Sequence, residues 1–256
     1  MNGQIQSLWR YPVKGFTPER LEAATLAAGA FFPCDRLYAV EDGPSGFDPA
    51  APAFVPKQRF TVLAKIPDVA RVRTAYDEAT GQIEAVMDGQ PVFHGDLASE
   101  PGREAFAAWL SAALGDLASG PLKVVQAPGH RFTDHPLGFV SIINLASVRD
   151  LEAKVGRPVD PLRFRANLYV EGWPAWSELD LVGATLSVGA TVRLKVVKRI
   201  VRCAATDVQP GTGIRDTTIP QTLMRNLNHA DCGIYAEVIA GGSIVSGDRI
   251  EVSGED

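Results

Sequence analysis

The chain has 256 residues, with 30 acidic and 25 basic side chains, a net charge of −5 and 46% hydrophobic residues. This composition is ordinary for a packed globular protein and excludes a disordered or collagen-like chain. No run reaches the roughly 18 consecutive apolar residues of a membrane span, and residues 1–4 lack the order of a signal peptide. We therefore expect a cytoplasmic protein with no membrane span, folded as one large domain or two small ones.

The cysteine content and the charge exclude two further classes. Cys34, Cys203 and Cys232 form no Cys-x-x-Cys pair, so we expect free thiols rather than a disulfide framework or structural zinc. A mildly acidic protein repels phosphate backbones, and the basic stretch from Thr191 to Arg202 has no interleaved aromatic residues. We expect no nucleic-acid partner.

Short segments of alternating apolar and polar residues, bounded by glycine and proline, recur along the chain. They occur at 5–9, 71–73 and 183–189, and such alternation is typical of β-strands with one buried face. We predict a fold that is mainly β with short helices, of the α+β class.

Three segments have helical periodicity instead. Apolar residues recur every three or four positions over 106–114, with Ser99 as the N-cap and Gly115 as the stop. A second helix is predicted over 147–155, and a third begins at Thr218, where the sequence has the form of a capping box.

Turn residues mark a domain junction and a loop. They cluster over 115–129 between two differently patterned halves, so we place the boundary near residue 122. Residues 42–56 contain four prolines and two glycines, which predicts a surface loop.

Residues 162–168 alternate between apolar and polar side chains. As a strand, this segment would place Arg163, Arg165 and Asn167 on one face. Two guanidiniums and an amide in a row could bind phosphate or carboxylate, and the alternative is a solvated strand face.

Two other segments could carry chemistry. Cys203 follows Arg202, and a nearby cation favours the thiolate that binds metals or attacks electrophiles; the alternative is a buried, inert thiol. The segment from His130 to His135 offers two imidazoles and a carboxylate, but its spacing matches no metal motif.

Taken together, several motifs resemble the MOSC proteins, the relatives of the molybdenum cofactor sulfurase C-terminal domain and of the mitochondrial amidoxime-reducing components. Their order and spacing span nearly the whole chain. The motifs are Tyr11-Pro12-Val13-Lys14, Cys34-Asp35-Arg36, Arg163 to Leu168, Trp176-Ser177-Glu178, Arg202-Cys203-Ala204-Ala205-Thr206, Pro210-Gly211-Thr212-Gly213, Gly233-Ile234-Tyr235 and Ser246-Gly247-Asp248.

The resemblance implies an N-terminal MOSC-type β-barrel domain over 1–122 and a MOSC β-barrel domain over 123–256. It also implies a molybdenum cofactor, molybdopterin, held between them, with Cys203 as both the metal ligand and the catalytic residue. The residues that match cofactor contacts by position, or adjoin them in sequence, are Lys14, Arg36, Arg163, Arg165, Asn167, Asn144 and Ser147.

Two positions depart from the family pattern. Gly15 replaces the serine that commonly follows the lysine, which removes a hydroxyl donor. Ala166 replaces the usual proline between Arg165 and Asn167, which relaxes the backbone while keeping both side chains.

The function that the resemblance implies is an oxidoreductase that reduces small N-hydroxylated or N-oxygenated compounds. Since no four-cysteine cluster motif is present, the electrons would come from a separate ferredoxin-, flavin- or cytochrome-type protein. Glu178 and Asp207 are candidate proton relays, each with the alternative of a surface or strand-end carboxylate.

The sequence also allows two alternatives to this function. The first is a carrier that holds the molybdenum cofactor, or sulfur on Cys203, and delivers it to another enzyme. The second is a pyridoxal phosphate site, which requires a lysine that forms a Schiff base. This alternative is disfavoured, because Lys14 is the one candidate for that lysine and is expected to contact an anion instead.

Overall fold

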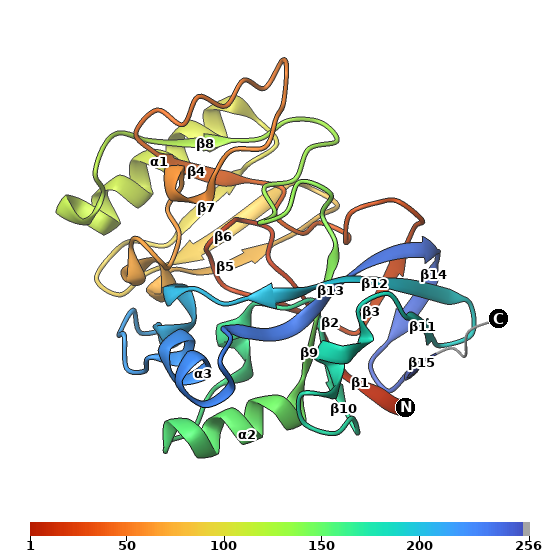
Figure 1. Cartoon of the computed structure of the whole chain (residues 1–256). Coiled ribbons are helices and arrows are strands. Elements are labelled where there is room, and N and C mark those ends of the chain that lie inside the picture. Colours follow the sequence, from red (N-terminus) through yellow and green to blue (C-terminus); the bar gives the residue numbers. More distant parts are fainter. Residues whose placement is uncertain (253–256) are drawn as a thin grey trace.

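Seven strands close into a barrel in the computed structural model of the protein, which describes residues 1–252 (Figure 1). In spatial order they are β1 (Asn2–Arg10), β10 (Leu168–Glu171), β9 (Val140–Asn144), β13 (Asp231–Ala240), β12 (Val192–Val201), β11 (Thr185–Val188) and β15 (Arg249–Val252). The last strand pairs with β1 again, and neighbours are antiparallel except β9 and β10. Closure leaves the seven strands no open sheet edge.

The barrel is filled by the inward side of its strands. Along β12, Val192, Leu194 and Val196 are buried while the residues between them face outward. This period of two is the pattern that a strand with one buried face requires. Ile5 of β1 and Ile234 of β13 belong to the same apolar core.

A second apolar core lies in the first half of the chain. It is built from a three-stranded sheet, a strand pair and one long helix. These elements are β5 (Arg73–Tyr76), β6 (Gln82–Val86), β7 (Phe93–Asp96), β4 (Ala39–Asp42) paired with β8 (Leu122–Val125), and α1 (Glu100–Leu114). Phe106 and Leu110 on α1 are fully buried against the sheet.

Smaller elements surround the barrel. A strand pair, β3 (Ala23–Leu26) with β14 (Gly242–Val245), and the short strand β2 (Glu19–Leu21) lie beside it. Two helices, α2 (Leu145–Val155) and α3 (Ile219–Leu227), contact each other below it (Figure 1). Single 3-10 turns complete the described elements: η1 (Lys57–Arg59), η2 (Pro67–Arg71), η3 (Gly115–Leu117), η4 (Pro161–Phe164), η5 (Ser177–Leu181) and η6 (Ala204–Asp207).

The predicted fold class and helices are confirmed, with local differences at the helix starts. The Ser99 hydroxyl caps α1 by accepting from the Gly102 amide, as predicted. Helix α2 begins two residues before the predicted start, because the Asn144 side chain supplies its cap. Thr218 precedes α3 but makes no side-chain cap; Asp207 Oδ1 accepts from the first amide of the helix instead, at 2.7 Å.

The strand predicted over 162–168 is wrong. Residues up to Phe164 form the 3-10 turn η4, and Arg165 has a left-handed backbone with φ of +53°. Asp160 starts this turn by accepting from the Leu162 amide. The side chains of Arg163 and Arg165 therefore do not share a strand face.

Two of the three short strand predictions are confirmed, and the third is confirmed only at its last residue. Segment 5–9 lies within β1, and segment 183–189 contains β11. Within 71–73, Arg71 ends η2 and Arg73 begins β5. Of the loop predicted over 42–56, Asp42 is the buried last residue of β4, whereas 43–56 hold no helix or strand and are largely exposed. None of the helices in the described part of the chain is long and apolar enough to cross a membrane.

The domain division stays a prediction. The proposed boundary near residue 122 falls where β8 begins, and β8 pairs with β4 of the first half. Strand β1, by contrast, is part of the barrel that later residues build. Residues 253–256 of the predicted second domain lie outside the described residues.

Candidate functional site

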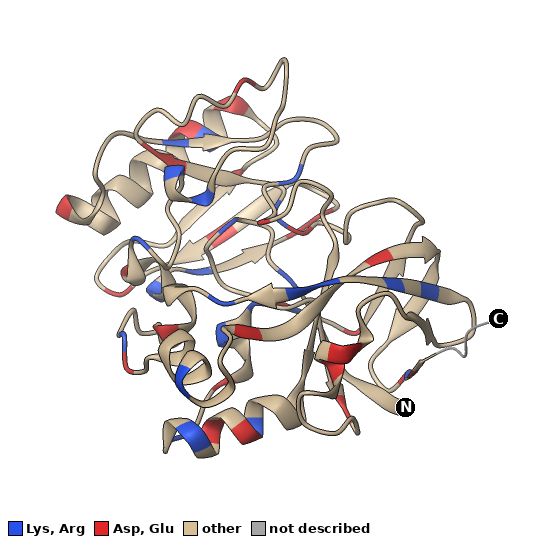
Figure 2. Cartoon of the chain, viewed as in Figure 1, with Lys and Arg blue, Asp and Glu red and all other residues tan. Residues whose placement is uncertain are grey.

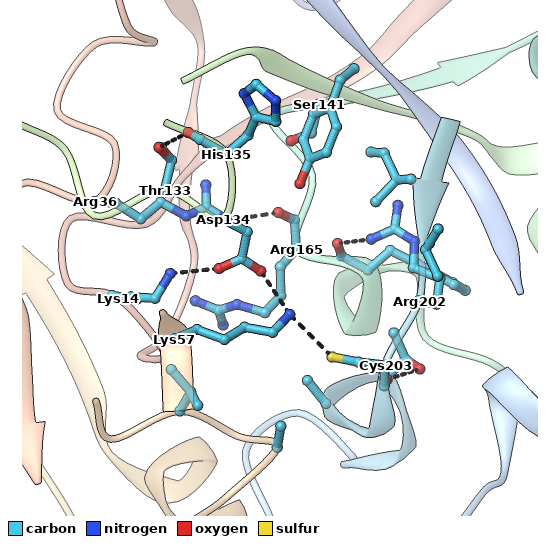
Figure 3. A pocket seen from close by; sticks show the side chains of 18 of the residues that line it. Lys14, Arg36, Lys57, Thr133, Asp134, His135, Ser141, Arg165, Arg202 and Cys203 are labelled. Carbon is cyan, nitrogen blue, oxygen red and sulfur yellow. Dashed lines mark hydrogen bonds and ion pairs between the residues drawn. The ribbon is translucent and has the colours of Figure 1, made fainter. Parts of the chain in front are cut away.

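A pocket of about 260 Å³ lies where the first-half core meets one end of the barrel. Figure 3 shows its side chains converging from segments that are far apart in sequence. Loop residues before β5 and around residue 134 form one side, and the turns before β10 and after β12 form the other. Eight lysine and arginine residues line it, against two aspartates.

Lys14 and Lys57 are joined by one carboxylate. Lys14 is 5% exposed, and its Nζ donates to the Phe132 carbonyl at 2.8 Å and to Asp134 Oδ1 at 2.5 Å. Lys57 Nζ lies 3.2 Å from Asp134 Oδ2. Burial lowers the pKa of Lys14, which Asp134 only partly offsets. Burial alone would raise the pKa of Asp134, but the charges of the two lysines outweigh it and hold that pKa well below its usual range.

Cys203 lies at the far end of this chain of contacts. It follows β12 by two residues and precedes η6, and its side chain is half-buried at the pocket wall. Its Sγ is 3.5 Å from Lys57 Nζ. Burial works against the charge of Lys57, but Asp134 and the thiol together outweigh it and raise the pKa of the ammonium. Lys57 therefore stays charged beside the sulfur.

Arg36 and Arg165 flank a buried tyrosine. Their guanidinium carbons lie 4.3 and 4.4 Å from the ring centroid of Tyr11, within the range of a cation–π contact. Arg36 pairs with Asp35, and its Nη2 donates to the Arg165 carbonyl at 2.9 Å. Left-handed backbone at Arg36 and Arg165, with φ of +50° and +53°, turns the chain at both positions.

Arg165 has a donor without a partner. Its Nη1 donates to the Phe16 carbonyl at 2.7 Å, while its buried Nη2 has no hydrogen-bond partner among the described residues. Burial and the neighbouring Arg36 lower the pKa of Arg165 to about 10. A buried guanidinium with an unsatisfied donor indicates a site built for an acceptor group.

Asn167 also lines the pocket, but its amide is engaged in holding strands together. Its Oδ1 accepts from the amide and the hydroxyl of Ser141, at 3.1 and 2.8 Å. Its Nδ2 donates to the Trp9 carbonyl at 3.2 Å. The side chain thus links β1, β9 and the start of β10 at the base of the pocket.

Arg163 touches the pocket wall, but its guanidinium binds elsewhere. It pairs with Asp216 and donates to the carbonyls of Thr206 and Asp207. The arginine fixes the turn η6 that follows Cys203.

Asn144 and Ser147 lie outside the pocket, in a separate buried cluster. Both donate to Oε2 of Glu178, at 2.9 and 2.8 Å. Glu178 is fully buried, and its other oxygen has no described partner. Burial outweighs these hydrogen bonds and raises the pKa of Glu178. Asp207, the other candidate relay, caps α3 and likewise does not line the pocket.

Several pocket residues escaped sequence reasoning. Lys57 belongs to no motif, Lys198 stands only in the basic stretch from Thr191 to Arg202, and Arg202 stands in a motif but was not predicted to bind a ligand. Asp134 stood in the segment considered for metal binding, yet within 1–252 no cluster of three or more His, Cys, Asp or Glu side chains could hold a metal ion. His135 instead stacks on Phe139, with ring centroids 4.5 Å apart.

Comparisons with known proteins cover both halves of the chain. Residues 2–116 match the model of the MOSC N-terminal beta barrel domain, and residues 130–251 match that of the MOSC domain. No curated protein matches.

Two crystal structures are similar at low identity. The YUAD protein from Bacillus subtilis is 14% identical, with 100% of this chain and 98% of that chain covered and a TM-score of 0.48. YiiM from Geobacillus stearothermophilus is 17% identical over 45% of this chain and 54% of that chain, with a TM-score of 0.36.

Proposed function

Because the chain belongs to the MOSC family, which is associated with molybdenum cofactor binding, we propose that it holds this cofactor in the pocket and reduces N-oxygenated compounds. One observation carries the proposal: the Cys203 sulfur and a buried cationic set face the same pocket. A thiolate suits a soft metal centre, and guanidinium and ammonium groups suit a phosphate. When bound, the cofactor would supply the two-electron chemistry of oxygen removal.

The residues present fit such a group at both ends. Cys203 would hold the metal through Sγ, which Lys57 contacts at 3.5 Å. At the other end, the unpaired Nη2 of Arg165 is a donor that a phosphate oxygen would satisfy. Lys14 and Arg36 lie beside it and would contribute further donors.

The protein's own residues would orient and shield the reacting site. Tyr11 fixes both arginines through its ring, and Asn167 fixes the strand ends beneath them. Arg163 fixes the turn after Cys203 by binding the carbonyls of Thr206 and Asp207. These contacts restrict the rotamers of the binding groups, which reduces the entropy lost when a ligand binds.

Metal analysis tests the proposal. The protein is purified from a host that makes the cofactor, and molybdenum is measured by elemental mass spectrometry. We expect near-stoichiometric metal in the parent and loss of it in Cys203→Ala, with Cys34→Ala as a matched control. Metal-free preparations of both the parent and the Cys34→Ala control, despite confirmed cofactor supply, would overturn the proposal.

Reductase activity is the second part of the test. Molybdenum-loaded protein is mixed with a chemical electron donor and an N-hydroxylated benzamidine, and the amidine product is quantified. If metal binds but no amidine forms, the carrier function with Cys203 as the sulfur site replaces the reductase. Transfer of sulfane sulfur from Cys203 to an acceptor protein would then be the expected activity.

A further inference from the structure

The pocket carries a charge opposite to that of the whole protein. The chain has a net charge of −5, and Figure 2 shows Asp and Glu distributed over many elements. Arg163 and Arg199 line the pocket but pair with carboxylates outside it. Six other cationic side chains line it, against the carboxylates of Asp35 and Asp134. The six are Lys14, Arg36, Lys57, Arg165, Lys198 and Arg202.

A phosphate-bearing ligand would offset only part of this excess. One phosphate carries about two negative charges at neutral pH, whereas the six cations exceed the two carboxylates by four charges. Arg36 and Arg165 flank Tyr11 at the end assigned to the phosphate. From there the positive charge continues through Lys14 and Lys57, which share the Asp134 carboxylate, to Cys203.

Among the described residues, Lys57 is the cation that contacts the sulfur. It stands on η1, directly after the irregular segment 43–56, and about a third of its side chain is exposed. Its Nζ contacts Cys203 Sγ at 3.5 Å, while Figure 3 shows it reaching across the pocket toward that residue. A small molecule that binds at the sulfur would therefore lie beside this ammonium.

Two further features of the pocket lining strengthen its positive electrostatic field. Lys198 is exposed on β12 at the pocket wall, with no carboxylate within ion-pair distance among the described residues. Val62 and Leu63 form an apolar wall, and both are more than nine-tenths buried. Apolar walls reduce screening and focus the field of the fixed charges.

We propose that the pocket selects negatively charged small substrates, with Lys57 and Lys198 as the residues that determine this specificity. The inference deepens the proposed function and rests on it for the reaction itself. The recognised chemistry is an oxygen-bearing acceptor that carries a carboxylate or another anionic group. Lys57 would hold that group beside Cys203, and Lys198 would attract it at the rim.

Alkylation of Cys203 tests the charge selection without any cofactor. Iodoacetate and iodoacetamide differ in one negative charge, and with each the thiolate sulfur forms a bond to carbon while iodide leaves. Rates at Cys203 are measured in cofactor-free protein by peptide mass spectrometry. Because both reagents need the same thiolate, the ratio of the two rates cancels any change in thiolate fraction.

We expect the iodoacetate-to-iodoacetamide ratio at Cys203 to exceed that of free cysteine by about threefold to tenfold at low salt. Lys57→Gln should remove most of this excess, Lys198→Gln part of it, and Lys57→Arg should retain it. Lys123→Gln, an exposed lysine on β8 outside the pocket, is the control and should leave the ratio unchanged. A ratio equal to that of free cysteine, or one that neither Gln variant lowers, would overturn the proposal.

Substrate kinetics give the second readout. With molybdenum-loaded protein, an N-hydroxylated benzamidine with a para-carboxylate should have a KM several-fold below that of the uncharged parent compound, and Lys57→Gln should abolish the difference. The two proposals can fail separately. If the protein binds no metal but its iodoacetate-to-iodoacetamide ratio exceeds that of free cysteine, the reductase proposal alone is overturned. If metal binds, but the two substrates have equal KM values and the alkylation ratio equals that of free cysteine, the charge selection alone is overturned.

Discussion

Arg163 and Asp216 form an ion pair in which Nη2 lies 2.9 Å from Oδ2, and their side chains are only 2% and 10% exposed. Among residues 1–252, Arg163→Met would leave this carboxylate the half-exposed Arg157 as its one ion-pair partner. Breaking a buried pair typically costs about 3 kcal/mol or more, so we expect the free energy of unfolding to fall by about 3 kcal/mol. Urea denaturation at neutral pH checks this; a loss below about 1 kcal/mol would contradict it.

Arg165→Met should reduce ligand binding much more than stability, although Arg165 stands only two positions after Arg163. The substitution removes a buried charge whose pKa is already lowered, and it breaks one hydrogen bond to the Phe16 carbonyl. We expect the free energy of unfolding to change by no more than about 1 kcal/mol, while molybdenum content falls severalfold. Denaturation and metal analysis on the same preparations separate the two effects.

Gly15→Ser should not restore the hydroxyl that the family pattern favours at this position. Gly15 has a φ of +90°, and an added Cβ would lie 2.4 Å from the Thr61 carbonyl oxygen. We expect a loss of about 2–3 kcal/mol in the free energy of unfolding, from backbone strain and the clash together. Gly129→Ser is the control: it has a similar φ of +72° but open space around it, so only about 1 kcal/mol should be lost. Equal losses in the two variants would exclude the clash.

Glu178 should make stability fall as pH rises. Burial raises the pKa of this carboxyl in the folded protein above the ordinary value of 4.5, so the folded state binds its proton more tightly than the unfolded state does. The resulting penalty is absent below the ordinary value, grows as pH rises through the raised pKa, and is complete above it. Glu178→Gln has no such penalty.

The measurement is urea denaturation of parent and Glu178→Gln at pH 4.5 and pH 8. We expect the variant to gain stability relative to the parent between the two values. Ser147→Ala is the comparison, since it removes a hydrogen bond to the carboxylate and should weaken the parent more at pH 8. A parent and Gln variant with parallel pH curves would show that Glu178 titrates normally.

Local patterns predicted the parts of the fold that local interactions determine. Helix α1 follows from its apolar spacing, its Ser99 cap and the terminating Gly115, all within one segment. The alternation of apolar and polar residues over 162–168 predicted a strand that does not form. Asp160 instead starts a 3-10 turn there, and Arg165 has a left-handed backbone. Such a turn depends on side-chain contacts that a period-two pattern does not contain.

The site was predictable only where a motif marked it. Cys203, Lys14, Arg36 and Arg165 line one pocket, and all four stand in the motifs that carried the resemblance to MOSC proteins. Lys57 is 146 residues from Cys203 and follows an irregular loop, so nothing local indicates that the two side chains meet. Asn144 and Ser147 were predicted from their position beside the family motifs, but they stand at and just after the end of β9 opposite to the pocket-lining Ser141 and donate to Glu178.

Strand β1 sets an order of events during synthesis. Its two barrel neighbours, β10 and β15, begin at residues 168 and 249, so the first strand emerges from the ribosome long before either partner exists. Until then the backbone groups of β1 lack their hydrogen-bond partners on β10 and β15. Contacts between residues so far apart in sequence also form slowly. A fragment that starts at residue 123 would lack this strand and expose the edges of β10 and β15 to other chains. The barrel that the second half of the sequence builds thus depends on a strand of the first half for its closure.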